Sequence, residues 1–278
     1  RPVLCLLSSK MINSNYSQIN TDINMAAALE FIHGATLLHD DVIDKGKIRR
    51  GQRSINDIWN NKFSVLLGDF MFSKSFQLMT KGNSLSAMES LAEVSSKISE
   101  GEFLQLSNEQ NINIKIEEYI NIISLKTAEL FGAAMKVPAI LTNKSPKLIK
   151  QLNTLGVNYG IIFQIIDDNL DYFGGKEIGK VIGQDFLEGK VTLPIILLLK
   201  KINKDQKEKI NTLFQKKKRT IKELKEIIKL LQKYEIEQEC REYAEKISVK
   251  SLIILNNFKN KQSQLLKELL VTSIKREN

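Results

Sequence analysis

Residues 25–44, MAAALEFIHGATLLHDDVID, combine an apolar helix pattern with a cluster of three aspartates. Apolar residues recur at steps of three and four between Met25 and Leu38, which is the period of an α-helix. Asp40 and Asp44 are four residues apart, so on a helix both carboxylates lie on one face, about one turn from each other. Carboxylates in this position repel one another and the helix macrodipole. The stretch therefore predicts a long helix whose C-terminal end binds cations.

A second stretch, QIIDDNLDY at residues 164–172, repeats this arrangement. Asp167 and Asp171 stand four residues apart at the end of another apolar helix pattern, and Gln164 falls on the same side as Asp168. Oxygen-only ligands favour a hard divalent ion, and Mg²⁺ is typically held by a few carboxylates together with substrate phosphates. Two such clusters predict a metal site that binds a phosphorylated ligand.

Each aspartate cluster is followed by a basic loop that contains glycine. The first loop is KGKIRRG at residues 45–51, and the second covers residues 174–190. Arg and Lys next to metal-binding carboxylates are the groups that bind phosphate oxygens. A single Asp-Asp-x-x-Asp is also typical of an ordinary solvated helix end, and the second copy is what favours the metal site. The four segments together indicate a site for a diphosphate or polyphosphate.

Helical periodicity extends over most of the chain, and the alternation of apolar and polar residues that marks strands is nearly absent. Only four prolines interrupt it; Ser145 before Pro146 is a helix start, and Thr192 to Pro194 can open another helix. The predicted fold is all-α: a single domain over residues 1–278, built as a bundle of long antiparallel helices around a central cavity. Helical patterns cover residues 25–38, 65–79, 85–106, 116–135, 148–166 and 221–255, with breaks expected near 46–60, 108–114, 137–145 and 173–192.

Composition excludes several classes of protein. Of the 278 residues 42% are hydrophobic, and no apolar run approaches the roughly 20 residues that cross a bilayer. Cys5 and Cys240 are the only cysteines. This count excludes a disulfide scaffold and a cysteine zinc site, and it predicts a reducing compartment, the cytoplasm.

The net charge of +9 is unevenly distributed. Residues 1–200 hold equal numbers of acidic and basic residues, whereas residues 201–278 hold 20 basic and 11 acidic ones. This segment mixes Lys with Glu at helical spacings and has few aromatic residues, which is typical of a solvated helix face and not of a nucleic-acid platform. We expect no nucleic-acid partner and, at most, peripheral association with an anionic membrane surface.

With both aspartate clusters and both basic loops, the chain resembles the trans-isoprenyl diphosphate synthases of the polyprenyl synthetase family, and most closely the bacterial octaprenyl diphosphate synthases. The resemblance is tightest at residues 28–54, 65–79, 98–106, 124–132 and 158–194 and fades after about residue 200. It implies the isoprenoid synthase fold and a homodimer. It also implies a prenyltransferase that condenses isopentenyl diphosphate onto an allylic primer, farnesyl diphosphate, in repeated head-to-tail steps. The implied product is all-trans octaprenyl diphosphate, for quinone side chains.

In this family Mg²⁺, which Mn²⁺ can replace, bridges the two aspartate motifs and the diphosphate of the allylic primer. The resemblance assigns the metal to Asp40, Asp41, Asp44, Asp167, Asp168 and Asp171. It assigns the allylic diphosphate to Arg49, Lys126, Thr127, Gln164, Lys180 and Lys190, and the isopentenyl diphosphate to Arg1, His33 and Arg50. The implied catalytic set is Asp40, Asp41, Asp44, Lys126, Asp167, Asp168 and Lys180.

The family's amino-terminal motif, Gly-Gly-Lys-Arg-x-Arg-Pro, is represented here by its last two residues, Arg1 and Pro2. The chain also begins without Met. We therefore expect a trimmed N-terminus, with the motif's substrate-binding Lys preceding Arg1.

Product length is predicted from the helix before the first cluster. Residues one turn before Asp40 lie on its face, beneath the reacting carbons, so Ala35 and Thr36 should line the tunnel for the growing chain. Both are small, and in this family bulky aromatics at these positions stop growth early, so the resemblance implies a long product. Candidates for the tunnel floor on the neighbouring helix are Phe72, Phe76 and Met79.

Several alternatives stay open. A farnesyl or geranylgeranyl diphosphate synthase carries the same motifs. A class I terpene cyclase would carry Asn/Asp-x-x-Ser/Thr-x-x-x-Glu as its second motif. A non-catalytic regulatory subunit would have lost carboxylates from one or both aspartate motifs. A helical interaction module would be expected to contain neither motif. His39, unlike His33, is expected to be a structural helix residue. Glu102 and Gln105 match a family element, but a buried hydrogen bond between helices explains them equally well.

Overall fold

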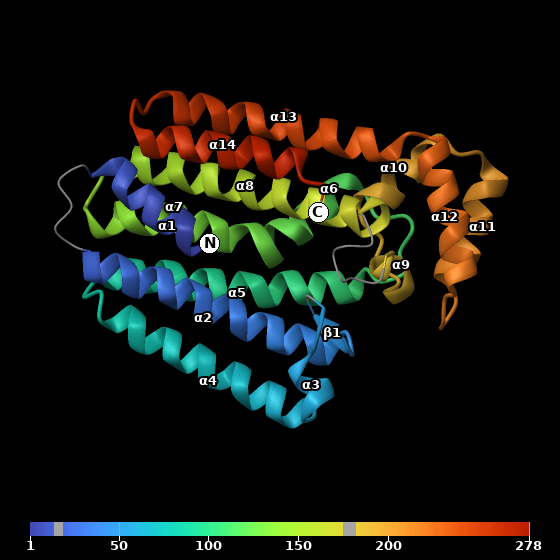
Figure 1. Ribbon diagram of the computed structural model, residues 1–278, viewed down its shortest axis with the longest axis horizontal. Helices are drawn as coiled ribbons and strands as arrows, with labels where there is room; N and C mark the ends of the chain where they lie inside the picture. The colour runs from blue at the N-terminus through green and yellow to red at the C-terminus, as the bar shows by residue number, and fades with distance from the viewer. Residues whose placement is uncertain (14–18, 50, 175–181, 278) are drawn as a thin grey trace.

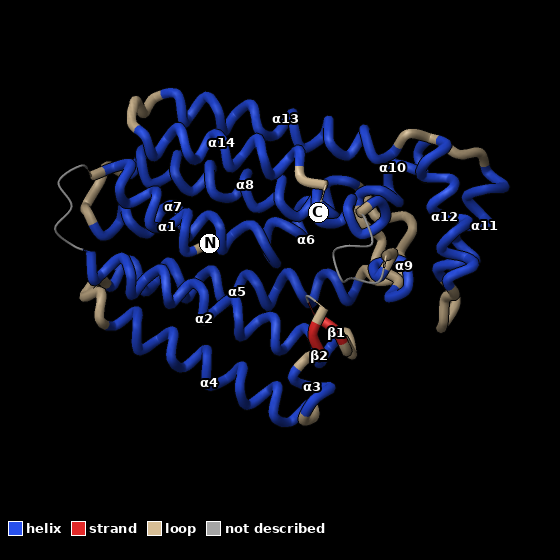
Figure 2. Tube along the Cα trace, viewed as in Figure 1, coloured by secondary structure: helices blue, strands red, loops and turns tan. Residues whose placement is uncertain are grey.

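The computed structural model describes residues 1–13, 19–49, 51–174 and 182–277. Arg50 and Lys180, both predicted to bind substrate, lie outside the described residues. Within them the chain forms long helices that run side by side along the longest axis (Figure 1), and the strands are limited to one short ribbon (Figure 2). The all-α prediction is confirmed.

The long helices form the body of the bundle. They are α2 (Ile19–Ile43), α4 (Asn61–Thr80), α5 (Leu85–Ser107), α7 (Glu129–Leu141), α8 (Pro146–Phe173), α13 (Ile236–Asn256) and α14 (Lys261–Lys275). The shorter elements are α1 (Pro2–Ile12), β1 (Ile48–Arg49), β2 (Gln52–Arg53), α3 (Ile55–Ile58), α6 (Ile116–Ile123), a π-helical turn (Ser124–Ala128), α9 (Gln184–Glu188), α10 (Leu193–Lys201), α11 (Lys204–Phe214) and α12 (Ile221–Lys233). Helix α4 packs on α2 at one edge of the bundle, and α13 and α14 cover α8 at the other (Figure 1).

The predicted start of α8 is confirmed, because Ser145 caps the helix by accepting a hydrogen bond from the Leu148 amide at 3.4 Å and Pro146 is its first residue. Helix α10 also begins after Thr192, but the Thr192 side chain makes no capping bond. Among the described residues, no helix is both long and apolar enough to span a membrane.

Two expected boundaries were wrong, and one expected helix contains an irregular turn. Helix α7 continues through Pro138 to Leu141, inside the region where a break was expected. The expected helix over residues 221–255 is two helices, α12 and α13, because Glu235 adopts a left-handed conformation with φ 54° between them. The pattern over residues 116–135 is one helical path, but a π-helical turn interrupts it.

Close packing of α5 and α8 against the π-helical turn positions the centre of the bundle. A Cβ atom on Gly101 of α5 would lie 2.4 Å from the Lys126 amide nitrogen, and one on Gly160 of α8 would lie 2.5 Å from Ala128 Cα. Only glycine permits backbones to approach this closely. The N-terminal half of α8 packs in one apolar cluster and its C-terminal half in another, so α8 joins the two parts of the core.

Candidate active site

The first aspartate cluster is at the C-terminal end of α2, where Asp41 forms a fork-shaped ion pair with Arg49 of β1. Arg49 Nε donates to both carboxylate oxygens at 2.9 and 3.1 Å, and one terminal nitrogen lies 2.8 Å from Oδ1. Burial on its own lowers the pKa of Arg49, but these hydrogen bonds raise it above its ordinary value. Bidentate pairs of this kind are strong and directional. Asp41 therefore holds the first basic loop in place.

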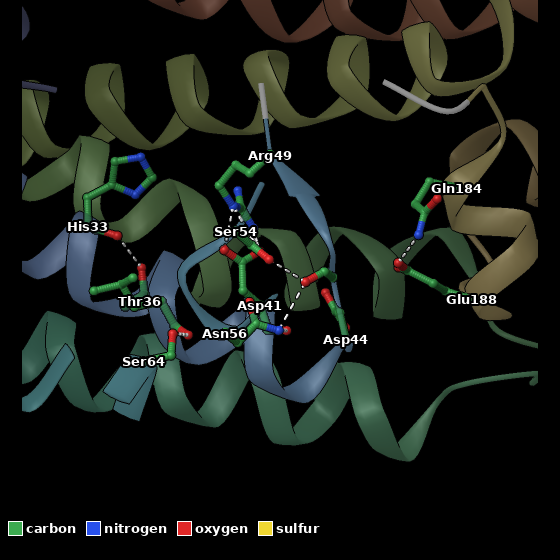
Figure 3. Close-up of polar contacts among 12 residues, drawn as sticks. His33, Thr36, Asp41, Asp44, Arg49, Ser54, Asn56, Ser64, Gln184 and Glu188 are labelled. Carbon is green, nitrogen blue, oxygen red and sulfur yellow. Dashed lines mark hydrogen bonds and ion pairs between the residues drawn. The ribbon is translucent and has the colours of Figure 1, made fainter. Parts of the chain in front are cut away.

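Two further side chains attach that loop to α2 (Figure 3). Asn56 donates to the carbonyl oxygens of Asp41 and Gly46, both at 3.0 Å, and Ser54 donates to Gly46 at 2.7 Å. The Asp41 carbonyl also accepts from the Gly46 amide at 2.9 Å, so these bonds fix the turn that follows α2. The loop that carries Arg49 is thus tied back over the aspartate cluster.

Lys190, in the loop after α9, connects the first cluster to the opposite side of the site. Its Nζ lies 2.9 Å from Asp44 and 2.8 Å from Glu188. Burial lowers the pKa of Lys190, but Asp44, Glu188 and Asp185 more than offset this and raise the pKa above its ordinary value. The ammonium group is therefore charged and surrounded by carboxylates.

Asp40 of the first cluster is a partly buried carboxylate. Burial raises its pKa to about 6, although the nearby Lys126 and Lys190 favour the ionised form. An added cation would favour the ionised form of Asp40 and offset the cost of burying its charge.

Lys126 and Thr127 stand on the π-helical turn, between α5 and α8. Lys126 forms an ion pair with Glu102 of α5. Thr127 donates to Gln164 Oε1 at 3.0 Å, and Gln164 Nε2 in turn donates to Asp168 at 2.7 Å. π-Helical turns are rare and recur at functional sites. Here the turn brings two predicted substrate-binding residues against the second aspartate cluster.

The second cluster, at the end of α8, has one deeply buried member. Asp168 accepts from the Tyr119 hydroxyl at 2.7 Å in addition to Gln164, and burial with the nearby Asp185 raises its pKa well above the ordinary range. Both carboxylate oxygens have protein partners. Asp168 therefore organises the site from within.

Asp171 binds the start of α9. Its two carboxylate oxygens accept from the backbone amides of Gln184 at 3.2 Å and Asp185 at 3.0 Å. Free amides at a helix start attract negative charge. Asp171 in this way fixes the short helix that leads to Lys190.

Asp167 lies on the α8 face that meets the C-terminal segment. Arg276, just after α14, donates to Asp167 at 3.1 Å, and its guanidinium stands 5.0 Å from the Phe163 ring centre. Arg241 holds the same segment through the carbonyl oxygens of Ile274 at 2.7 Å and Arg276 at 3.3 Å.

A cavity of about 140 Å³ opens between α5, α6, α8 and the loop after α9. Its polar wall includes Lys126, Thr127, Gln164, Asp168, Asp185 and Lys190, and its apolar wall includes Ile122, Ile123 and Val191. Five of these six residues carry a predicted role, and the sixth, Asp185, donates its backbone amide to Asp171. Five of the residues predicted from the sequence, Asp168 of the second cluster among them, therefore surround one cavity.

Arg1 and His33, predicted to bind isopentenyl diphosphate, do not line this cavity. The Arg1 guanidinium lies over the Phe131 ring at 4.4 Å, and the His33 carbonyl accepts from Thr36. His39 faces α4, where its ring fits against Gly68 and lies 3.4 Å from Asp69, as expected of a structural residue.

The five residues predicted to set chain length are divided between core and surface, and Thr36 is half-buried on α2. Ala35 is fully buried and Met79 almost so, Phe72 packs against the core, and Phe76 is 45% exposed on the outer face of α4. The cavity lining contains none of them. Their roles in chain length stay predictions.

The donor set suits a hard divalent cation, because it is made of carboxylate oxygens. In the described part of the chain, no group of three or more Asp, Glu, His or Cys converges closely enough to hold a metal ion by itself. Mg²⁺ typically takes one or two carboxylates and completes its shell with water and substrate phosphates. The arrangement fits such an ion better than an all-protein cage.

Sequence reasoning missed several residues of the site. Tyr119 and Arg276 have no local motif, and their roles follow only from packing onto α8. Asp185 lies within the second basic loop but was not singled out. Its distance of 14 residues from Asp171 gives no periodic signal.

A family model described as polyprenyl synthetase matches residues 1–231. The chain is 40% identical over 213 residues to the octaprenyl diphosphate synthase of Escherichia coli K12, and 37% identical over 215 residues to a short chain isoprenyl diphosphate synthase of Methanothermobacter thermautotrophicus. Each match covers 76% of this chain. A crystal structure of a polyprenyl synthase from Caulobacter crescentus, complexed with calcium and isoprenyl diphosphate, superposes with a TM-score of 0.94 at 34% identity. That match covers 100% of this chain and 84% of the other.

The chain therefore belongs to the polyprenyl synthetase family. It spans 65% of the length of both of these curated relatives.

Proposed function

We propose that the protein is a trans-prenyltransferase that joins isopentenyl diphosphate to an allylic diphosphate. The observation that carries this proposal is the position of Lys126 and Lys190. Both lie near Asp40 of the first cluster, and both line the cavity together with Asp168 of the second cluster. Two lysine side chains between two sets of carboxylates suit a metal-bound diphosphate, because carboxylates bind the metal ion and lysines bind the phosphate oxygens.

Within the six aspartates, the contacts support a division of roles. Asp41, Asp168 and Asp171 are held by Arg49, by Tyr119 with Gln164, and by the amides of α9. They position the loops around the site. Asp40, with its raised pKa, and Asp44 and Asp167, which Lys190 and Arg276 contact, are the proposed direct ligands of Mg²⁺ or Mn²⁺.

The chemistry requires stabilisation of a leaving diphosphate. Breaking the allylic carbon–oxygen bond leaves a delocalised carbocation and a diphosphate whose charge rises as it departs. A bound Mg²⁺ would neutralise that charge. Arg49, Lys126 and Lys190 supply fixed positive charge on the same side, and Lys180 joins them by resemblance.

The carbocation then accepts the double-bond electrons of isopentenyl diphosphate, which forms the new carbon–carbon bond, and the product loses a proton. The departed diphosphate is the proposed base. The apolar wall of Ile122, Ile123 and Val191 limits attack by water. The residues proposed to bind isopentenyl diphosphate are Arg1, His33 and Arg50, of which Arg50 lies outside the described residues.

We propose farnesyl diphosphate as primer and octaprenyl diphosphate as product, for quinone side chains. Support comes from Ala35 and Thr36, which are small, and from the similarity to an octaprenyl diphosphate synthase. A shorter product is the second candidate, because a short chain synthase is similar at nearly the same identity. The cavity of about 140 Å³ is smaller than a typical small-molecule site of roughly 300 Å³ or more, so a long chain needs further space along α2.

A homodimer in the cytoplasm is part of the same proposal. Phe63, Leu66 and Phe70 expose more than half of their surfaces along one face of α4, at the edge of the bundle (Figure 1). Exposed apolar patches of this kind favour an interface, and a symmetric second copy can cover the same face. Buried free thiols at Cys5 and Cys240 suit a reducing compartment.

The direct experiment is incubation with isopentenyl and farnesyl diphosphates plus Mg²⁺, followed by extraction and chromatography of the products. We expect incorporation of isopentenyl units into a linear prenyl diphosphate of about forty carbons, eight units long. A cyclic hydrocarbon formed from farnesyl diphosphate alone would support a terpene cyclase instead. Failure to incorporate isopentenyl diphosphate with any allylic primer would contradict the proposal.

A further inference from the structure

Helices α11 and α12 form a hairpin beyond α10, at one end of the molecule (Figure 1). This hairpin, residues 204–233, contains 11 basic and four acidic residues, so it carries seven of the nine excess positive charges of the chain. The uneven charge is a property of one structural unit and not of the whole surface.

Packing directs the charge outward. Leu224, Ile227 and Leu231 form the buried face of α12. The opposite face of α12 places three lysines at helical spacing in solvent, Lys222, Lys225 and Lys229, and Lys218 is exposed in the loop before the helix. Lys217 is exposed beside this row.

Some of the positive charge is neutralised within the hairpin, and some is not. Lys216 pairs with Glu223, and Lys209 lies 2.8 Å from Glu226. Among the described residues, Lys217, Lys218 and the lysines of α12 at 222, 225 and 229 form no ion pair. Ile221, at the start of α12, is 51% exposed among them. The result is an unneutralised basic stripe with an apolar residue inside it.

The hairpin is attached to the candidate active site. Arg219 is 9% exposed, and a Cβ on Gly189 would lie 2.1 Å from its guanidinium, so Arg219 packs directly on the residue before Lys190. Leu224 packs in the same way on Gly183, just before α9. The buried face of the hairpin therefore contacts the loop that carries Lys190, and the lysines of α12 lie on the opposite, solvent-exposed face.

We propose that this basic stripe docks the protein on a bilayer surface rich in anionic phospholipids. Lysines arranged along one helix face match a plane of negative headgroups, and Ile221 can enter the boundary between headgroups and acyl chains. A nucleic acid fits less well, because the stripe offers lysines without the aromatic side chains on which bases stack. The docking is independent of the proposed function, although it would bring a prenyl diphosphate close to the membrane.

The test is co-sedimentation of the full chain with vesicles, without substrates. One set is pure phosphatidylcholine, and the other contains phosphatidylcholine and phosphatidylglycerol in about two-to-one proportion. We expect binding to the anionic vesicles alone, and loss of that binding in about 1 M salt, where charges are screened within a few ångströms. Equal binding to both vesicle types, or none to either, would overturn the proposal.

Two variants with the same change in net charge locate the surface. The first replaces Lys217, Lys218, Lys222 and Lys225 by Gln. The control replaces four exposed lysines elsewhere, at positions 147, 150, 259 and 261. At about fivefold per lysine, the first variant should bind at least about a hundredfold more weakly, while the control stays within a few fold of the wild type.

Three results would overturn the proposal even if the wild type binds vesicles. Equal weakening in both variants would assign binding to net charge. Tighter binding of the wild type to single-stranded RNA than to anionic vesicles, lost in the first variant, would assign the stripe to nucleic acid. Unchanged vesicle binding with slower turnover of soluble substrates would assign it to substrate attraction. Circular dichroism of both variants confirms that the helices are intact.

Discussion

The Nζ atom of Lys190 lies 2.9 Å from Oδ2 of Asp44, although the two residues are 146 positions apart. The contact joins the end of α2 to the loop after α9, and both side chains are largely buried, at 12% and 21% exposure. The two halves of the proposed site are thereby held together by a single ammonium group.

Replacing Lys190 by Gln should destabilise the fold and reduce turnover. Asp44 and Glu188 would then face each other without their cation, and loss of one partner of a buried pair costs about 3 kcal/mol. Urea unfolding measures the difference. The matched control is Lys200→Gln, at an exposed position on α10, and equal unfolding free energies for the two variants would contradict the account.

Arg276 and a metal ion should compete for Asp167. The Arg276→Gln variant removes a partly exposed ion pair, so we expect about fivefold tighter binding of Mn²⁺. Titration calorimetry or electron paramagnetic resonance gives the dissociation constant without any turnover. The control variant is Lys275→Gln, at the neighbouring exposed residue. Identical Mn²⁺ affinities for both variants would show that Arg276 does not compete with the metal ion for Asp167.

Stability without metal should depend on pH through Asp40. Burial raises the pKa of Asp40 from 3.8 in the unfolded chain to about 6. The proton is therefore bound more tightly in the folded state, so this carboxyl stabilises the fold below pH about 4 and loses that contribution as the pH rises through 6. The difference amounts to at most about 3 kcal/mol.

The Asp40→Asn variant isolates this effect, because an amide does not titrate. Between pH 4 and 7 its unfolding free energy should fall less than that of the wild type, by about the same 3 kcal/mol or less. Parallel curves for the two proteins would contradict the assignment.

The Ala35→Tyr variant should shorten the product towards fifteen- or twenty-carbon diphosphates. Ala35 is fully buried, so a phenol ring must either fill an adjoining tunnel or overpack the core. Chromatography of radiolabelled products separates these cases when circular dichroism shows a folded variant. Unchanged long chains would show that Ala35 does not face the tunnel. The less buried Thr36→Phe variant supplies a second readout if Ala35→Tyr fails to fold.

Phe70→Glu should convert a dimer to a monomer. Phe70 is 55% exposed on α4, and a charge in the centre of an apolar interface is costly to bury. Light scattering after gel filtration gives the mass. Ile253→Glu introduces the same charge at a 61% exposed position of α13 and should leave the mass unchanged. A monomeric wild type would contradict the homodimer.

Much of the fold could be predicted because helix signals here are local. The apolar period of α2 and the Ser145–Pro146 start of α8 each depend on a few neighbouring residues. The break before α13 could not be predicted, since Glu235 is neither Gly nor Asn and only tertiary packing holds it in a left-handed conformation. A break was expected around Pro138, but α7 accommodates this proline one turn before the helix ends.

The charged motifs of the proposed site could be found in the sequence, but the contacts between its distant residues could not. The aspartates of each cluster share a helix face, which the sequence pattern contains. The partners of Asp168 and Asp44, Tyr119 and Lys190, are 49 and 146 residues away, so no spacing could reveal them. The chain-length residues were argued from helix position alone, and their role stays a prediction.

The central claim is that two aspartate clusters act through a divalent cation on a diphosphate. It is tested most directly by measuring incorporation of isopentenyl diphosphate with Mg²⁺ and with excess EDTA, for the wild type, for Asp40→Ala and for the exposed control Asp205→Ala. We predict turnover with Mg²⁺ in the wild type and control, none in EDTA, and a loss of about a hundredfold or more in Asp40→Ala with the helices intact. Full activity in EDTA, or equal activity of Asp40→Ala and the wild type, would contradict the account.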